Sequence, residues 1–474
     1  MNVSFLASFF GYISILSIIG VIVSRRQKSS SDFMVGNYSI NYWVTAIATH
    51  ATDMSSWLFM GFPGIIYTVG IFGCWSAIGL LLCMFLAWQF IAEKLRVTTE
   101  KYKAYTLSTY FEKRFNDTSG LIRIVSALFG LFFFAHYITA GIVALGRALE
   151  ATFGFSYLTG IFLGTGTVAL YTLLGGFVAI ALNDFLQGMF VLFIIVLFPI
   201  FALTSIGGFG AITTAAYAKN ISLTLFPDFS LKTIFAILTP VFGWGLGYFG
   251  QPHILINFMG IDNPKEIRKA KVIGLAWQVV TMSAAALIAL IGIAFFKTPL
   301  VNSELVFINM VKVMFNPFLA GFILCAILAA ATSTMDSQIL VSASMLTQDI
   351  YKKIFHRTAS QKKLLTVSRI SGILIVFVSF LLAINNNETV FALVRYPWCG
   401  LGSTFGPILI LSLYSKRINK TGALAGILVG GIIAATWKYT GLPLKEYAII
   451  PGFFLSLCSA FFASCSCFCL GCKK

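Results

Sequence analysis

Charged residues are scarce in this sequence, and acidic residues are the scarcest. Only 10% of the 474 residues are charged and 58% are hydrophobic, whereas soluble domains have about 25% charged and about 45–50% apolar residues. So few charges leave too little polar material to cover a water-soluble particle of this length. The composition therefore excludes a soluble protein and predicts an integral membrane protein.

Motifs for secretion and for hydrolytic enzymes are also missing. No small-residue cleavage pattern follows the first apolar stretch, and Arg25 and Arg26 come after it rather than before it, so we interpret this stretch as a membrane span and not as a signal peptide. No Gly-x-Ser-x-Gly or His-Glu-x-x-His motif accompanies the candidate bases His50, His136 and His253. This absence argues against an intramembrane enzyme.

The nine cysteines do not form a disulfide framework. Cys74, Cys83, Cys325 and Cys399 fall in apolar spans and are interpreted as small buried hydrophobic residues. Cys465, Cys467, Cys469 and Cys472 cluster near the end of the chain with a spacing that is not a standard zinc pattern. We interpret this cluster as part of a C-terminal tail that tolerates sequence variation, with a metal site as the alternative.

Apolar runs recur along the whole chain, and each is long enough to cross about 30 Å of hydrocarbon as a helix of about 20 residues. We predict about thirteen spans, at residues 5–23, 40–68, 70–92, 125–147, 157–175, 180–204, 232–256, 272–296, 313–345, 364–386, 390–414, 421–438 and 447–469.

The net charge of +17 is distributed unevenly between the two sides of these spans. Basic residues concentrate at 25–28, 94–123, 265–271, 352–363, 416–420 and 473–474. By the positive-inside rule these segments are cytoplasmic, which places the N-terminus in the periplasm and the C-terminus in the cytoplasm of a bacterial inner membrane. The positive charge is thus explained by topology and by a lipid bilayer, and no nucleic-acid partner is expected.

Two spans contain residues that disrupt helices. The second span has an acid and a hydroxyl pair within 51–57 and a Gly/Pro break at 61–64, and the seventh has four glycines, a glutamine and a proline within 243–253. Irregular backbone at membrane depth is tolerated only inside protein or beside a wet cavity. Their interval of five spans fits two inverted five-helix repeats, each beginning with a discontinuous helix. Glycines that serve close helix packing are the alternative.

Acidic residues within spans are the next indication of a site. Asp53 and Asp336 fall inside spans, and Asp184 lies at the entrance to the sixth. A carboxylate at membrane depth costs a few kcal/mol and is by default a candidate for function. For Asp184, a position in a wet loop at 175–184 is an equally good interpretation.

The ninth span carries small and hydroxyl residues on one helical face. Ala330, Ser333 and Thr334 are spaced i, i+3, i+4, so they face the same neighbour. Their oxygens suit a hard monovalent cation, completed by carbonyls of an unwound helix. Interhelical hydrogen bonds are the alternative for this cluster, and Asp53 on the opposite broken helix favours the ion site.

At these stretches the sequence resembles the sodium:solute symporter family, and within it the bacterial sodium/proline symporters. The resemblance extends over essentially the whole chain and is densest at residues 51–64, 131–157, 243–253 and 316–351. It implies an all-α membrane protein with a LeuT-like core of five plus five inverted-repeat helices. We expect one domain over 1–474, divided into 1–30 (a peripheral helix), 40–204 and 232–414 (the two repeats), 421–469 (two peripheral helices) and 470–474 (a cytoplasmic tail).

The resemblance also implies roles for individual residues. Sodium would be bound by the carbonyls of Ala51 and Met54 and by Ala330, Ser333 and Thr334. Coupling or gating would involve Asp53, Ser55, Asp184 and Asp336. The substrate pocket would include Trp57, Gly61, Tyr137, Trp244, Tyr248 and Pro252, whose aromatic rings suit a compact pyrrolidine ring and its ammonium group.

Two positions depart from the family pattern. Tyr38 and Asn257 stand where the proline symporters carry arginine, which places substrate range and coupling in doubt rather than the fold. We therefore predict sodium-driven uptake of proline or a similar small amino acid by alternating access, with sodium as the coupling ion and no other cofactor. A symporter for another solute such as pantothenate is the nearest alternative, and a channel is a more distant one.

Overall fold

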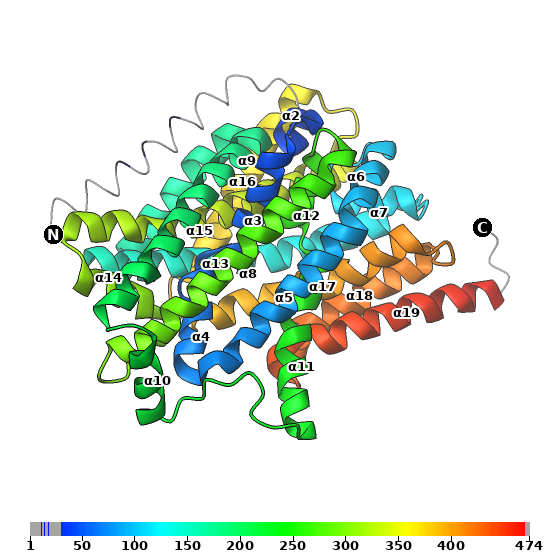
Figure 1. Cartoon of the computed structure of the whole chain (residues 1–474). Helices are drawn as coiled ribbons and strands as arrows, with labels where there is room; N and C mark the ends of the chain where they lie inside the picture. The colour runs from blue at the N-terminus through cyan, green and yellow to red at the C-terminus, as the bar shows by residue number, and fades with distance from the viewer. Residues whose placement is uncertain (1–10, 12–13, 15–17, 19–29, 470–474) are drawn as a thin grey trace.

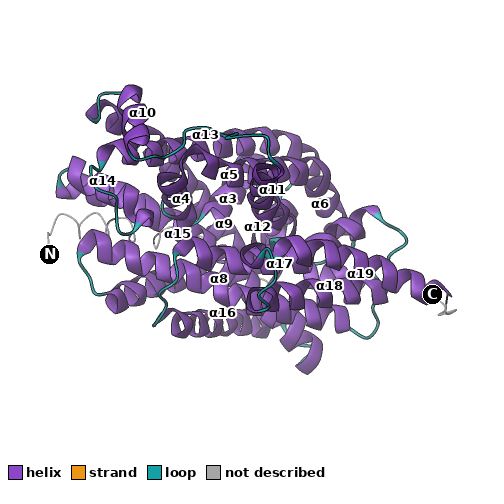
Figure 2. Cartoon of the chain, turned by 90° about the horizontal axis from the view of Figure 1, so that it is seen from below, coloured by secondary structure: helices purple, strands orange, loops and turns teal. Residues whose placement is uncertain are grey.

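The computed structural model describes residues 30–469 together with the isolated positions 11, 14 and 18. Within that part of the chain every regular element is helical, and the helices pack into a bundle (Figures 1 and 2). The predicted first span at 5–23, the peripheral helix at 1–30 and the tail at 470–474 lie outside the described residues.

The helices run from α2 to α19 in chain order. Their bounds are α2 (Ser30–Val35), α3 (Tyr42–Met54), α4 (Gly61–Val69), α5 (Trp75–Leu86), α6 (Ala92–Lys101), α7 (Leu107–Arg114), α8 (Leu121–Phe153), α9 (Tyr157–Ser205), α10 (Phe209–Ala218), α11 (Leu231–Gly245), α12 (Pro252–Gly260), α13 (Ile267–Phe295), α14 (Val306–Met314), α15 (Pro317–Ser344), α16 (Gln361–Ala383), α17 (Val390–Tyr414), α18 (Lys420–Thr436) and α19 (Ile449–Cys469). Short 3-10 or π segments also occur, among them η2 (Ser56–Leu58), η5 (Leu246–Gly250) and η8 (Met345–Phe355).

Polar side chains cap the N-termini of several of these helices. Side chains of Asn41, Ser156, Ser230, Asn316 and Thr389 each accept a hydrogen bond from the N–H three residues further on. Each one satisfies a donor that the first turn of a helix leaves without a partner. These caps fix where the helices start although hydropathy alone leaves the boundary vague.

Nine stretches of the described residues are long and apolar enough to cross a membrane, so the chain is a multi-pass membrane protein. Four predicted spans are not among these nine stretches: the first, the broken second, the fifth and the eleventh. Of these, the fifth is present as the shorter apolar helix Tyr157–Ala169. The predicted start of the ninth span at 313 is wrong, because α14 ends at Met314 and α15 begins at Pro317. The count of thirteen stays a prediction.

The fifth and sixth spans join through a sharp bend in α9. Gly176 has φ 57° and ψ −174° there, a backbone conformation open to glycine and costly for residues with a Cβ atom. The sixth span therefore starts at Gly175, five residues before the predicted start at 180, and the segment up to Asp184 is helix rather than loop.

Both predicted interruptions are confirmed. The first separates α3 from α4 at Ser55, whose φ of 47° and ψ of −171° end the helix. The second separates α11 from α12 through η5 and the extended residue Gln251, after which Pro252 occupies the first turn of α12. Proline suits that position because its missing N–H is not needed in a first turn.

The two broken segments run in opposite directions through the bundle. Ile40, just before α3, forms a parallel bridge with Ile261, just after α12. The Ile40 N–H donates to the Gly260 carbonyl at 3.3 Å, and the Asp262 N–H donates to the Ile40 carbonyl at 2.9 Å. The first segment thus begins where the second ends, as an inverted arrangement requires.

Candidate functional site

The last turn of α3 supplies carbonyl groups without helical partners. The helix ends at Met54, and the Ser55 hydroxyl oxygen accepts a hydrogen bond from the Trp57 N–H at 3.1 Å. The carbonyls of the last four residues of a helix have no partner within it, and here these are Ala51 to Met54. They carry the partial negative charge of the helix end, at a point where the surrounding residues are buried.

Helix α15 presents its hydroxyls to these carbonyls. Ser333 Oγ donates to the Ala51 carbonyl at 3.0 Å and also lies 3.1 Å from the Ala330 carbonyl. Thr334 Oγ1 donates to the Ala330 carbonyl at 3.3 Å. The structure thus joins Ala51 directly to the predicted face of α15, and every oxygen in this set is neutral.

Met54 lies one turn beyond Ala51 on the same side of α3, since residues three apart are neighbours on a helix. Its thioether accepts a hydrogen bond from Gln278 Nε2 of α13 at 2.7 Å. Gln278 Oε1 in turn lies 3.0 Å from His50 Nδ1. Helix α13 therefore also contacts the end of α3, which sequence reasoning did not anticipate.

The carboxyl groups of Asp184 and Asp336 form a second polar cluster. Asp184 is fully buried on α9 and not in a wet loop, so that interpretation was wrong; the bend at Gly176 lets the helix start early enough to enclose it. Asp184 Oδ2 accepts from Thr52 Oγ1 at 2.9 Å and from Ser337 Oγ at 3.3 Å. Asp336 lies within hydrogen-bonding reach of it.

Asp53 points the other way, into the gap between the two broken segments. Its side chain is 5% exposed and its Oδ2 has no hydrogen-bond partner among the described residues. It lines a small cavity with Trp57, Tyr137, Trp244 and Trp398. An unpartnered buried carboxyl group is costly, which makes Asp53 a candidate for contact with a ligand in this gap.

Stacked aromatic rings fill most of this gap. The Trp57 ring centroid lies 4.9 Å from that of Trp244 and 5.0 Å from that of Phe62. The remaining cavity is about 10 Å³, which is the space of about one water molecule. The pocket is therefore closed, and a ligand the size of an amino acid requires Trp57 or Trp244 to move.

The structure places the predicted pocket residues in two groups. Trp57, Tyr137 and Trp244 line the cavity, and Gly61 lies directly beneath Trp57. Tyr248 and Pro252 are buried in the second break but are not among the residues that line the cavity.

Gly61 controls the room available to Trp57. A Cβ atom at this position would lie 2.8 Å from Trp57 Cδ1 and 3.5 Å from Phe391 Cα, so Gly61→Ala is expected to restrict the indole ring. Because overpacking costs about 1–3 kcal/mol, we expect the KM for the transported solute to rise roughly tenfold. The measurement is initial uptake against solute concentration in proteoliposomes. Gly210→Ala, which meets no atom within 4 Å, is the control and should keep the original KM; equal KM values for both variants would contradict the placement of Trp57.

Sequence reasoning missed several residues of this site. Trp398 Nε1 donates to the Trp244 carbonyl at 2.9 Å, and Gln251 Nε2 donates to the Trp398 carbonyl at 3.1 Å. Together they connect the second break to α17. A signal existed for Ser337, which continues the i, i+3, i+4, i+7 pattern of residues 330, 333 and 334, and for Thr52, which precedes Asp53.

The two positions that depart from the family pattern lie in different surroundings. The Arg96 guanidinium of α6 lies over the Tyr38 ring, 4.3 Å from its centroid, so a cation is present beside this position. Asn257 is buried on α12, and its Nδ2 has no hydrogen-bond partner in the described chain.

Comparisons with known proteins agree with this architecture. Residues 33–430 match the model of the Sodium:solute symporter family. The chain is 40% identical to the high-affinity proline transporter PutP of Bacillus subtilis over 451 residues, which cover 94% of this chain and 95% of that protein. It is 40% identical to the sodium/proline symporter of Escherichia coli over 456 residues, covering 94% and 90%.

Among solved structures, a Na+-coupled sialic acid symporter in a substrate-bound outward-open state superposes with a TM-score of 0.84 at 22% identity, covering 98% of both chains. That likeness shows the fold, and the sequence matches show the lineage. The chain belongs to the sodium:solute symporter family.

Proposed function

We propose that this protein carries proline, or an amino acid of similar size, into a bacterial cell together with sodium. The observation on which the proposal depends is the shared last turn of α3. One side of that turn meets Ser333 of α15, and the other directs Asp53 into the aromatic cavity. A cation on one side and a zwitterion on the other would both contact the same short segment.

This arrangement supplies a means of coupling. Sodium between Ala51 and Ser333 would replace the direct hydrogen bond with ion contacts and so fix the end of α3. A fixed α3 end sets the position of Ser55 and therefore of Trp57, whose N–H bonds to Ser55. Binding of sodium would thus favour binding of solute, and the reverse holds by thermodynamic reciprocity.

The substrate groups match the cavity by chemistry. The rings of Trp57 and Trp244 suit an apolar pyrrolidine ring, and the Asp53 carboxylate and Tyr137 suit its ammonium group. Gly61 begins α4, and once the Trp57 ring that covers it moves, this half-helix N-terminus would favour a substrate carboxylate. We assign Asp184, Asp336 and Ser55 to coupling or gating and no residue to catalysis. Tyr248 and Pro252, which do not line the closed cavity, would contact the solute only once the pocket opens toward the second break.

Entry and orientation form part of the proposal. A cavity of about 410 Å³ includes Arg147, Asn302 and Glu304, near the end of α8 and the start of α17. The basic segments around α6, α7 and η8 lie at the other end of α8, so we assign that end to the cytoplasm and the Arg147 cavity to the outside. The chain would then bind solute from the periplasm, with the N-terminus outside, the C-terminus inside, and 40–204 and 232–414 as the two repeats.

A solute panel tests the proposal. Purified protein in proteoliposomes with an imposed inward sodium gradient should accumulate labelled proline, and unlabelled proline should compete better than pantothenate or other amino acids. Uptake of a different solute would identify the alternative symporter. Proline accumulation that ignores the sodium gradient would contradict the assignment of the coupling ion, and turnover of thousands of ions per second without solute would indicate a channel.

A further inference from the structure

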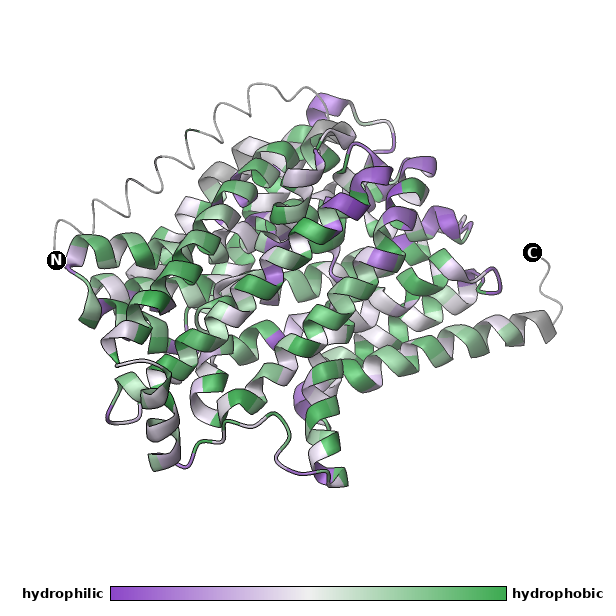
Figure 3. Ribbon diagram, in the orientation of Figure 1, coloured by the Kyte–Doolittle hydropathy of each residue, from purple (hydrophilic) through white to green (hydrophobic). Residues whose placement is uncertain are grey.

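A further cavity, distinct from the aromatic cavity and from the Arg147 cavity, lies at the end of the bundle where hydrophilic residues gather, around α6 and α7 (Figure 3). Its volume is about 240 Å³, a little below the range of about 300–1,000 Å³ that is typical of sites for drug-sized ligands. Six cationic side chains line it, from α7, α8, η8 and the loops beside them: Lys103, Lys113, Arg123, Lys352, Lys353 and Arg357. The transport site described above does not use any of them.

Neighbouring acids neutralise only part of this charge. Glu112 binds both Arg123, at 3.1 Å, and Lys353. Asp349 accepts from Arg123 Nε at 2.7 Å and from two threonine hydroxyls. In the described part of the chain, Lys103, Lys113, Lys352 and Arg357 have no acidic partner within 4.0 Å, and the cavity therefore has an excess of positive charge.

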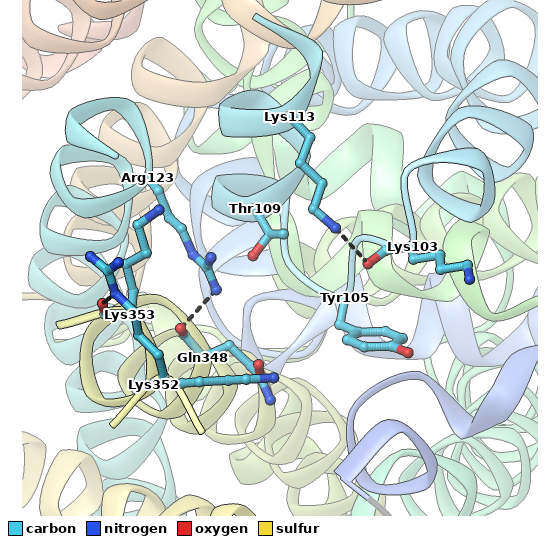
Figure 4. A pocket seen from close by; sticks show the side chains of 9 residues that line it. Lys103, Tyr105, Thr109, Lys113, Arg123, Gln348, Lys352 and Lys353 are labelled. Atoms are coloured by element: carbon cyan, nitrogen blue, oxygen red, sulfur yellow. Dashed lines mark hydrogen bonds between the residues drawn. The ribbon is translucent and has the colours of Figure 1, made fainter. Parts of the chain in front are cut away.

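Hydrogen bonds to neighbouring residues hold two of these cationic side chains in place. Arg123 is fixed by Asp349, Glu112 and the Gln348 carbonyl, the last at 2.7 Å, and Lys113 is fixed by the carbonyls of Tyr102 and Lys103. Figure 4 shows Lys113, Arg123 and Lys352 around one common space. Burial lowers the pKa of Lys113, and the positive charges of Arg123, Lys352 and Lys103 lower it further against the opposing Glu112. A bound anion would relieve that repulsion.

We propose that this cavity binds a phosphate group, either the headgroup of an anionic phospholipid or a soluble organic phosphate. Phosphate oxygens accept several charge-assisted hydrogen bonds at once, which matches lysines and arginines arranged around a small space. Exposed apolar residues next to the cations favour the lipid source: Leu121 begins α8, and Ile354 and Phe355 end η8 at 48% and 67% exposure. Acyl chains would lie against these residues.

Occupation of the cavity would affect a segment that reaches the transport site. η8 continues directly from α15, which carries Ser333 and Thr334. A phosphate that bridges Lys352 of η8 to Lys103 and Lys113 would hold the end of this long helix against α7. The inference does not depend on which solute is carried.

The test removes two cations that have no acidic partner. Lys103→Gln with Lys352→Gln leaves the Arg123 network intact, and Lys265→Gln with Lys416→Gln removes the same charge from exposed positions outside the cavity. The full chain is placed in phosphatidylcholine nanodiscs with and without phosphatidylglycerol, and retained phosphatidylglycerol is measured by native mass spectrometry. Because a hydrogen bond to a charged group contributes about 1.5–3 kcal/mol, loss of two such donors in the cavity variant should weaken binding roughly 100-fold or more. The control pair loses only general surface charge, so its binding should change much less.

A second experiment distinguishes a phospholipid headgroup from a soluble organic phosphate as the ligand. Glycerol 3-phosphate is titrated into each protein in pure phosphatidylcholine nanodiscs by calorimetry. Binding of phosphatidylglycerol alone assigns the lipid headgroup, and binding of glycerol 3-phosphate that the cavity variant also loses assigns a soluble phosphate. Equal losses in both variant pairs, or no preference of the unaltered protein for either phosphate over neutral lipid, would overturn the proposal. The last measurement needs no variant, so a misfolded variant does not leave the question open.

Discussion

Replacing Asp53 with asparagine is expected to abolish sodium-stimulated uptake while the protein still inserts into the membrane. The amide keeps the shape of the side chain and removes its charge, at a position that is 5% exposed and has an unpartnered Oδ2. A hydrogen bond to a charged group contributes about 1.5–3 kcal/mol, which corresponds to a loss of roughly 10- to 150-fold in affinity. Initial uptake at low and high sodium measures the effect.

The matched control for this experiment is Asp228→Asn. Asp228 is exposed in the loop before α11, where its Oδ1 accepts the Ser230 N–H at 2.8 Å, a bond that the asparagine oxygen can also accept. This variant should transport at the original rate. If the Asp53 variant retained the original sodium dependence, the carboxylate would have no part in coupling.

The second large effect is expected from removing two hydroxyls of α15. The double variant Ser333→Ala/Thr334→Ala deletes the oxygens that face the Ala51 and Ala330 carbonyls and leaves backbone ligands alone. Because each lost ligand removes about 1.5–3 kcal/mol, we expect the sodium concentration for half-maximal uptake to rise roughly 100-fold or more. Uptake against sodium concentration gives this value directly.

Helix α15 supplies its own control. Ser342 and Ser344 are buried and donate to carbonyls four residues back at 2.7 and 2.8 Å, as Thr334 does. Ser342→Ala/Ser344→Ala therefore tests the loss of two buried hydroxyls from this helix away from Ala51. A similar loss of sodium affinity in both double variants would assign the effect to helix stability and not to an ion site.

The interrupted segments could be predicted because their causes are local. Glycine, proline and polar residues cannot sustain a continuous apolar helix, and residues 51–64 and 243–253 each combine glycines, polar residues and one proline. The shared face of Ala330, Ser333 and Thr334 likewise follows from helical periodicity. Contacts between distant elements could not be read in this way: the bond from Gln278 to Met54 spans 224 positions, and nothing in either local pattern indicates it.

The surroundings of Asp184 could not be predicted from the sequence pattern, because they depend on the backbone conformation of a single residue. Paired glycines before it suggested a loop, because glycine is typical of turns. Of the two glycines only Gly176 adopts a positive φ, and the helix resumes at once, so the Asp184 carboxyl group enters the core. The backbone conformation of Gly176 thus decides whether Asp184 lies in solvent or in the protein interior, and a hydropathy pattern carries no information about that conformation.

The pairing of Ile40 with Ile261 has a mechanical consequence. The pairing connects the start of α3 to the end of α12, and Arg96 Nε stabilises this connection by donating a hydrogen bond to the Ile261 carbonyl at 2.6 Å. A passage cannot form on this face by fraying of a single segment. Opening of this face would either move α3, α12 and this part of α6 together or break three hydrogen bonds to backbone carbonyls at once, so we expect such an opening to be cooperative.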